Sequence, residues 1–308
     1  MDDTKEPIND ADEVCANCGK AAVDDVKLKI CTACKLVKYC SVECQKNHRP
    51  QHKKECKRKA AEIREDKLFT QNEGSYLGEC PICLLPLPLD LDKSTIFSCC
   101  CKWICDGCNY TNKKRELEEG LGHKCPYCRE AVPFTEEKID QNYMERVKVN
   151  DPVALYQVGS KYQEKGDFEG AFEYWIKAAE LGYMDAHFNL AVMYRQGDGV
   201  EKDLKKEIYH LEEAAIGGHA GARFNLGCYE WNNGRHDRAT RHFIIAAKQG
   251  HDDALEGVKN GFAAGVVSKE DYASALRGHQ AAVDATKSKQ REEANNYFNM
   301  SNQPRSVG

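Results

Sequence analysis

Cysteines are concentrated in the first part of this chain: sixteen of its 17 cysteines lie before residue 130, and only Cys228 follows. Most of them come in pairs with two or three residues between them, the spacing at which two side chains can bind one zinc ion. Residues 80–128 alone hold nine cysteines. A segment this short cannot bury a large apolar core, so metal binding has to supply much of its folding free energy, on the order of 10 kcal/mol per zinc site.

Disulfide bonds are the alternative explanation for so many cysteines. However, the chain starts with an acidic, polar segment, MDDTKEPINDADE, and no hydrophobic signal segment follows Met1. The net charge is −5, and no apolar run approaches the roughly 20 residues needed to cross a bilayer. We therefore expect zinc rather than disulfides, no membrane partner, and an intracellular location that is cytoplasmic or nuclear.

The first module, residues 15–56, offers eight candidate ligands in four close pairs. They are Cys15 and Cys18, Cys31 and Cys34, Cys40 and Cys44, and His52 and Cys56. A close pair can chelate one ion, and the longer gaps allow two pairs to meet around it. The spacing therefore predicts two zinc ions in this module.

The string YCSVECQ followed by HKKEC, after two Cys-x2-Cys pairs, resembles a MYND-type zinc finger over the whole module. The resemblance implies interleaved ligation, in which Cys15, Cys18, Cys40 and Cys44 share one zinc and Cys31, Cys34, His52 and Cys56 share the other. It also implies a protein-interaction module that receives proline-rich peptides on a Gln and a Trp four residues further on. Gln45 is present, but Arg49 stands where the Trp is expected, which removes a flat apolar platform for proline rings.

The central stretch, residues 80–129, reads CPIC, SCCCKWICDGC and CPYCRE, an order that resembles an all-cysteine RING-type finger. The resemblance implies that Cys80, Cys83, Cys105 and Cys108 bind one zinc, and that Cys125 and Cys128 bind a second with two members of the cysteine cluster. Lys102 stands where the common form has a His ligand. We favour Cys99 and Cys100, because Cys100 lies at the family's usual distance from Cys105; Cys101 and His123 are the alternatives.

Three further positions bear on function: Ile82, Pro126 and Arg129. The resemblance implies that they correspond to the residues with which RING fingers of ubiquitin ligases contact the ubiquitin-conjugating enzyme and its cargo. Such a ligase works by positioning its partners, so we assign no catalytic side chain. The alternative is a non-enzymatic zinc-finger scaffold or adaptor that assembles protein complexes, since a shared fold does not fix an activity.

Other functional classes find little support in the sequence. It contains no Gly-rich phosphate loop, Gly-x-Ser-x-Gly elbow or His-Glu-x-x-His motif, and zinc sites with four protein ligands are structural rather than catalytic. Basic residues between positions 46 and 67 are diluted by acidic ones, and the net charge is negative. Nucleic acid is therefore disfavoured as a partner.

After residue 151 the chain repeats itself. Ala-Ala pairs at 178/179, 214/215 and 246/247 recur at intervals of 36 and 32 residues. Matching helix starts fall at Ala154, Ala186, Ala222 and Ala254, and small residues recur at Gly159, Ala191 and Gly227. Paired helices that cannot bury their faces alone stack into a solenoid. The pattern resembles Sel-like repeats, relatives of the tetratricopeptide repeat, and this resemblance implies protein partners.

The predicted fold is therefore multidomain: two small zinc-stabilised cross-brace modules, with four Zn²⁺ ions in total, followed by an all-α helical repeat solenoid. We expect a disordered acidic N-terminus at 1–14, a MYND-type finger at 15–56, a charged helical linker at 57–79, a RING-type finger at 80–129, a linker at 130–150, Sel-like repeats at 151–284 and a frayed polar tail at 285–308. In the ligase interpretation, a ubiquitin-conjugating enzyme binds the central finger. The repeats, the MYND-like finger or both recruit an unknown substrate or adaptor.

Overall fold

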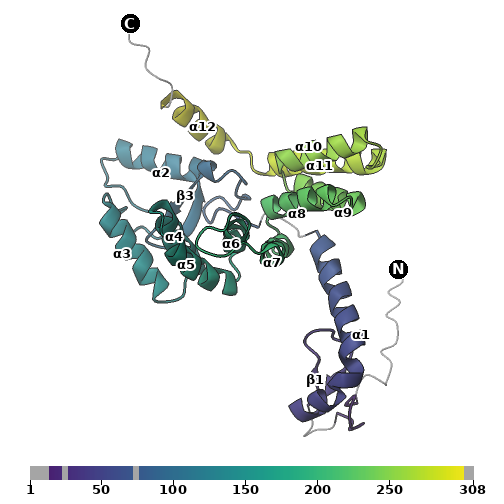
Figure 1. The fold of residues 1–308 in the computed structure, drawn as a ribbon. Helices are drawn as coiled ribbons and strands as arrows, with labels where there is room; N and C mark the ends of the chain where they lie inside the picture. The colour runs from purple at the N-terminus through teal and green to yellow at the C-terminus, as the bar shows by residue number, and fades with distance from the viewer. Residues whose placement is uncertain (1–13, 23–26, 72–75, 302–308) are drawn as a thin grey trace. The chain divides into compact units, whose positions relative to one another are not determined.

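The computed structural model describes residues 14–22, 27–71 and 76–301 (Figure 1), so the predicted disordered N-terminus lies almost entirely outside the described residues. Contacts divide the chain into two compact units, residues 1–70 and residues 71–308. Among the described residues, no helix combines the length and apolarity that a membrane crossing requires.

The first unit combines a small hairpin with one long helix. Strands β1 (Lys29–Ile30) and β2 (Lys38–Tyr39) pair antiparallel, and α1 (Val42–Phe69) follows. Ser41 caps α1 by accepting a hydrogen bond from the backbone N–H of Cys44 over 3.1 Å. Because α1 continues without interruption to Phe69, the finger and most of the charged stretch predicted as a linker share one helix.

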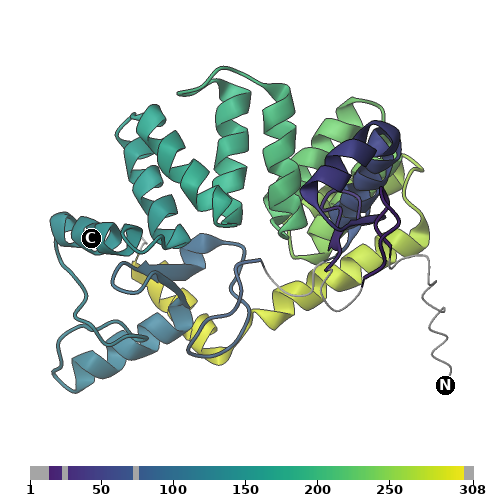
Figure 2. The same ribbon diagram turned by 90° about the horizontal axis from the view of Figure 1, so that it is seen from below.

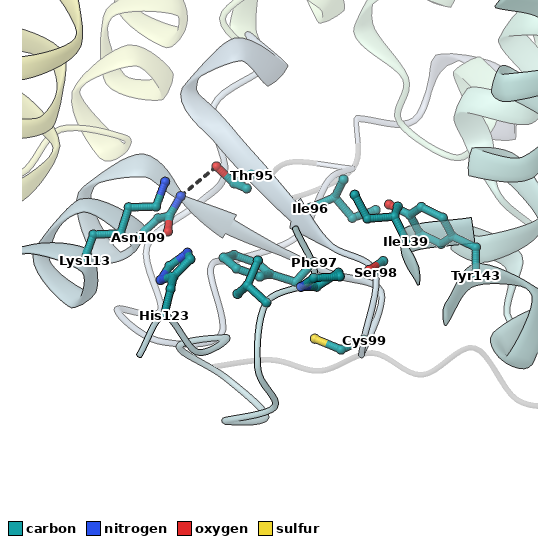
Figure 3. Close-up of a pocket in the computed structure, with 12 residues that line it drawn as sticks. Thr95, Ile96, Phe97, Ser98, Cys99, Asn109, Lys113, His123, Ile139 and Tyr143 are labelled. Atoms are coloured by element: carbon teal, nitrogen blue, oxygen red, sulfur yellow. Dashed lines mark hydrogen bonds between the residues drawn. The ribbon is translucent and has the colours of Figure 1, made fainter. Parts of the chain in front are cut away.

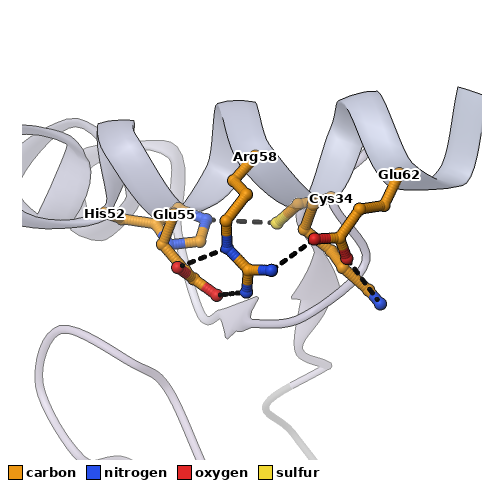
Figure 4. Close-up of polar contacts among 6 residues, drawn as sticks. Cys34, His52, Glu55, Arg58 and Glu62 are labelled. Atoms are coloured by element: carbon orange, nitrogen blue, oxygen red, sulfur yellow. Dashed lines mark hydrogen bonds and ion pairs between the residues drawn. The ribbon is translucent and has the colours of Figure 1, made fainter.

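Acidic residues on α1 pair with some of its basic ones. Figure 4 shows Arg58 between Glu55 and Glu62, and its guanidinium is paired with both carboxylates. These pairs are solvent-exposed, so each contributes little to stability. They do, however, place acidic side chains beside a basic one on this segment.

The second unit begins with a compact cysteine-rich part. It contains the short 3-10 helix η2 (Leu91–Lys93), the antiparallel strands β3 (Ser94–Phe97) and β4 (Lys102–Cys105), and helix α2 (Asp106–Glu118). Its core has seven buried residues: Cys80, Leu87, Phe97, Ile104, Cys105, Cys108 and Cys125. Four of these seven are candidate zinc ligands, so the packing of this core depends on whether the thiols bind zinc. Helix α2 begins directly after Cys105, so Cys108 lies in its first turn.

Residues 130–150, predicted as a linker, contain helix α3 (Glu136–Val147). Thr135 caps this helix by accepting a hydrogen bond from Lys138 N–H. Tyr143 of α3 is buried in a cluster with Cys101, Ala154 and Val158. Helix α3 therefore packs the cysteine-rich part against the first helix of the repeats, a role that a flexible linker could not have.

The repeats form four helix pairs that follow one another along the chain (Figure 1). The pairs are α4 (Pro152–Glu164) with α5 (Phe168–Glu180), α6 (Met184–Gln196) with α7 (Leu204–Ile216), α8 (Ala220–Asn232) with α9 (His236–Lys248), and α10 (Asp252–Ala263) with α11 (Lys269–Ala285). The four alanines that mark the predicted helix starts lie inside the first helix of each pair, and all are fully buried. The predicted helical solenoid is confirmed.

Small residues allow the helices of a pair to approach closely. A Cβ atom at Gly159 would lie 2.6 Å from Cδ1 of Trp175, and one at Gly227 would lie 2.5 Å from Cε1 of Phe243. Both distances are far below van der Waals contact. The large aromatic side chain of the second helix therefore fills the space that glycine leaves on the first.

The end of the chain differs from the expectation of a frayed polar tail. Residues Lys289–Ser301 form helix α12, which packs against α2 of the cysteine-rich part (Figures 1 and 2). Ala294 of α12 is fully buried, and Arg291 is only 8% exposed. Residues 302–308 lie outside the described residues. The contacts that order α12 are long-range ones, which the polar composition of this segment does not reveal.

Candidate zinc sites

The candidate ligands gather into four clusters, in each of which the ligand atoms lie within 4.8 Å of one another. The clusters are Cys15, Cys18, Cys40 and Cys44; Cys31, Cys34, His52 and Cys56; Cys80, Cys83, Cys105 and Cys108; and Cys99, Cys100, Cys125 and Cys128. In both modules the first and third pairs meet, as do the second and fourth. This interleaving is the arrangement expected of a cross-brace finger.

Distances within the clusters suit tetrahedral zinc. The sulfur–sulfur separations between neighbouring cysteines run from 3.3 to 3.8 Å. A tetrahedral ion with Zn–S bonds of about 2.3 Å requires separations of about 3.8 Å, whereas a disulfide requires about 2.05 Å. None of the 17 cysteines, all within the described ranges, is bonded to another. The donor set of fifteen thiols and one imidazole is one that zinc prefers.

Most of the Cys-x2-Cys pairs share one backbone conformation. In four of the five pairs, the residue after the second cysteine has a positive φ: Gly19, Lys35, Leu84 and Arg129, with φ of 73°, 54°, 58° and 66°. Its N–H donates to the carbonyl of the first cysteine over 2.8 to 3.0 Å. The left-handed conformation costs about 1–3 kcal/mol at a residue other than glycine, so it persists only where the surroundings impose it. A metal ion bound by both cysteines would impose it.

Backbone N–H groups in these turns favour the thiolate form that zinc requires. Burial raises the pKa of Cys15, but hydrogen bonds from the backbone N–H groups of Cys40, Cys18 and Asn17 outweigh it and bring the pKa to about 6. The pKa of Cys128 is likewise lowered, because the backbone N–H of Glu130 and neighbouring thiols outweigh the effect of burial. The backbone of these turns therefore stabilises the thiolate form of Cys15 and Cys128, which is the form that binds a metal cation.

The cysteine cluster at 99–101 is divided by the turn between β3 and β4. Cys99 lies 3.3 Å from Cys128 and Cys100 lies 3.8 Å from Cys125, measured between sulfurs. Cys101 has a positive φ of 53° and packs instead with Tyr143 and the start of the repeats. The other alternative, His123, pairs its Nδ1 with Glu116 over 2.8 Å. The structure thus brings together the two cysteines that we favoured and leaves both alternatives outside the cluster.

In the first finger, the two positions linked to peptide binding lie one turn apart on α1. Gln45 is partly buried and Arg49 is exposed. Nearby, the Tyr39 hydroxyl lies 3.0 Å from His48 Nδ1, and the His48 ring stacks on His52. A charged, flexible side chain thus occupies the position of the expected Trp, so the surface beside Gln45 differs in character from a proline-binding platform.

A depression of about 700 Å³ lies beside α2 in the second unit, and Ile82, Pro126 and Arg129 all line it. Ile82 is 43% exposed. Arg129 donates a hydrogen bond to Oδ1 of Asn112 over 3.2 Å, and Asn112 in turn donates to the carbonyl of Lys124 over 3.1 Å. The buried Asn112 thus holds the guanidinium of Arg129 at the rim of the depression.

A second, smaller cavity of about 220 Å³ lies between β3, α2 and α3. Figure 3 shows the apolar lining residues Phe97, Ile139 and Tyr143, and the polar lining residues Lys113 and His123. Asn109, which is 1% exposed, donates to the hydroxyl of Thr95 over 2.9 Å, while its own Oδ1 has no hydrogen-bond partner. Sequence reasoning did not single out this cavity, because its walls come from four separate segments.

Comparison with known proteins supports two of the three modules. Residues 15–56 match the MYND finger family, and residues 152–183, 185–219 and 220–251 each match the Sel1 repeat. The three repeat matches fall on α4–α5, α6–α7 and α8–α9, so the fourth pair, α10–α11, extends the array beyond them.

Individual relatives share short stretches with this chain. The HcpC protein of Helicobacter pylori (strain J99) is 46% identical over 56 residues, which is 18% of this chain and 19% of HcpC. Chitin synthase regulatory factor 4 of Schizosaccharomyces pombe is 34% identical over 84 residues, 27% of this chain and 13% of that protein. The crystal structure of a Sel1 repeat protein from Oxalobacter formigenes aligns with 63% of this chain and 85% of its own, at 20% identity and a TM-score of 0.42.

The chain is therefore an N-terminal cysteine-rich zinc module followed by a helical Sel1-repeat solenoid. Sel1 repeats mediate protein–protein interactions, and the cysteine clusters can bind zinc ions. Together these features define a chain that combines a zinc finger with Sel1 repeats.

Proposed function

We propose that residues 80–129 form a RING-type finger and that the chain is a ubiquitin ligase. The observation that carries the proposal is the depression beside α2, in which Ile82, Pro126 and Arg129 converge although more than 40 residues separate the first from the others in sequence. These are the positions through which a RING finger meets a ubiquitin-conjugating enzyme. We further propose that the sixteen clustered residues bind four zinc ions that shape this surface.

Each of the three residues has a separate role in the proposed reaction. Ile82 offers an apolar contact to the conjugating enzyme, and Pro126 shapes the neighbouring turn. Arg129, held by Asn112, hydrogen-bonds the enzyme-linked ubiquitin and favours its reactive pose. Catalysis of this kind is positioning, so the chain needs no nucleophile of its own. The Sel1 repeats, the MYND finger or both recruit the substrate.

A non-enzymatic scaffold is the second candidate. It is favoured by the absence of catalytic motifs and by the fact that the two matched modules are both interaction modules. In either role the many reduced thiols suit an intracellular compartment, cytoplasmic or nuclear.

Replacing Ile82 with Ala should weaken binding of the conjugating enzyme by about 1–2 kcal/mol, as expected for a truncated interface anchor. Replacing Arg129 with Ala should leave binding nearly intact and slow ubiquitin transfer, because its contact forms only in the reactive pose. Self-ubiquitylation with a panel of conjugating enzymes measures transfer, and titration of one active enzyme measures binding.

Matched controls lie on α2 outside the depression. Leu117, which is 83% exposed, and Lys114 do not line the depression, so Leu117→Ala and Lys114→Ala should behave like the unaltered protein. All four variants should keep their zinc, since none alters a ligand. No transfer with any enzyme of a broad panel, at full zinc content, would favour the scaffold. If neither Ile82→Ala nor Arg129→Ala changed the rate of ubiquitin transfer, the conjugating enzyme would bind a surface other than this depression.

A further inference from the structure

Helix α12 lies directly on the cysteine-rich part of the second unit. A Cβ atom at Gly107 of α2 would lie 2.8 Å from the backbone nitrogen of Arg291, so the two helices approach closely at this glycine. Further along, the ring of Tyr110 packs 4.9 Å from the ring of Tyr297, measured between centroids. Ala294 is fully buried between these contacts along α12. This is the packing of an integral element rather than of a loosely attached tail.

Arg291 is the residue through which α12 reaches a candidate zinc cluster. Its Nη2 lies 3.6 Å from the sulfur of Cys83 and 3.3 Å from the carbonyl oxygen of Leu85. Its Nη1 donates to the carbonyl of Pro86 over 2.8 Å and to that of Thr286 over 2.7 Å. One guanidinium thus joins a ligand sulfur and the turn that follows it to the residue that ends α11.

Charge explains why a cation is placed here. Four thiolates around one Zn²⁺ leave a net charge of about −2 on the cluster of Cys80, Cys83, Cys105 and Cys108, three of which are buried. Arg291 is itself only 8% exposed, and a buried cation is costly unless an anion or several acceptors surround it. The cluster and the guanidinium therefore compensate each other, and an N–H group directed at a ligand sulfur also fixes the orientation of that ligand.

We infer that Arg291 is a positioning residue for the zinc site formed by Cys80, Cys83, Cys105 and Cys108, and that α12 is a working part of this finger. Zinc in this cluster stabilises the docked α12, and docked α12 stabilises the bound zinc to the same extent, because linkage between two binding events is reciprocal. The inference needs only zinc binding, so it stands whether or not the finger transfers ubiquitin.

The first experiment measures zinc affinity in the full chain by competition with a chromogenic chelator. Arg291→Ala should weaken zinc binding at one of the sites by about 10–100-fold, the usual effect of losing a residue that holds a metal ligand. Arg291→Lys keeps the charge but loses the paired N–H groups of the guanidinium. Its zinc affinity should lie between those of Arg291→Ala and the unaltered protein. The control Arg277→Ala removes an exposed arginine of α11 and should leave the zinc affinity unchanged. Equal affinities for Arg291→Ala and the unaltered chain would overturn the inference.

A second readout separates a contact with sulfur from a general loss of packing. In the cobalt-substituted chain, loss of the N–H···S bond should move part of the thiolate-to-cobalt charge-transfer absorption to longer wavelength, because the ligand sulfur becomes more electron-rich. An unchanged absorption band in Arg291→Ala would mean that Arg291 does not act on the cluster.

The reciprocal effect is measured without altering Arg291, so it is decisive even if Arg291→Ala does not fold. In Cys83→Ser, hydrogen exchange of residues 289–301 should become faster than in the unaltered chain. Exchange of α8, a helix of the third repeat, should be the same in both proteins and serves as the control. If α12 remained equally protected in Cys83→Ser, the proposed link between zinc and α12 would be contradicted.

Discussion

Metal analysis of the purified, reduced chain should find four zinc ions per molecule. The sixteen candidate ligands form four clusters with the separations that tetrahedral zinc requires. Neither cysteine-rich part has a large apolar core, so each site should contribute on the order of 10 kcal/mol to folding. A strong chelator should therefore unfold both cysteine-rich parts while most of the repeat helices remain. A count of two or fewer in fully folded protein would contradict the paired sites.

Two neighbouring cysteines give a sharper form of this test. Cys100→Ser should lose one zinc, because its sulfur lies in a cluster 3.8 Å from that of Cys125. Cys101→Ser should keep all four ions, since Cys101 packs with Tyr143 and not with a ligand. The two variants remove the same atom from adjacent residues, so each serves as the control for the other. The reverse result would reassign the ligand.

Trp175→Ala should destabilise the repeats by about 3–5 kcal/mol, the usual cost of truncating a buried aromatic side chain. Trp175 is fully buried, packs onto Gly159 and donates from Nε1 to the carbonyl of Tyr156 over 3.2 Å. Its removal leaves a cavity between two helices and takes one donor from the Tyr156 carbonyl, which keeps the hydroxyl of Ser160. Chemical denaturation followed by the helical circular dichroism signal measures the loss.

The matched control for this change is Trp231→Ala. Trp231 is only partly buried at the edge of the second repeat cluster, where its ring lies 4.5 Å from that of His236. Its truncation should cost clearly less than that of Trp175, on the order of 1 kcal/mol. Equal losses for the two variants would mean that the cavity beside Gly159 is not what determines stability.

Local spacing was enough to predict much of this molecule. A pair of cysteines two residues apart forms a turn whose geometry depends on its own few residues, so the ligand pairs could be read directly from the sequence. The repeats were equally visible, because stacked helix pairs impose the same small and large residues at a fixed period. Ala154, Ala186, Ala222 and Ala254 are buried at equivalent places for that reason.

Other features were decided only by the tertiary structure. The choice among Cys99, Cys100 and Cys101 depends on a turn that directs two side chains to one side and the third towards α3, and the spacing alone admits all three. The depression beside α2 depends on long-range placement in the same way, since its lining residues come from three segments and Gln290 of α12.

The C-terminal segment shows the physical reason most clearly. The sequence by itself determined the zinc-ligand pairs and the helical repeats, because both arise from interactions between residues close in the chain or repeated along it. It could not determine that α12 docks, since an isolated helix of this length is marginally stable and is formed here by packing. That packing depends on contacts such as the one between Arg291 and Cys83, which are separated by 208 residues. Only the folded chain brings such residues together.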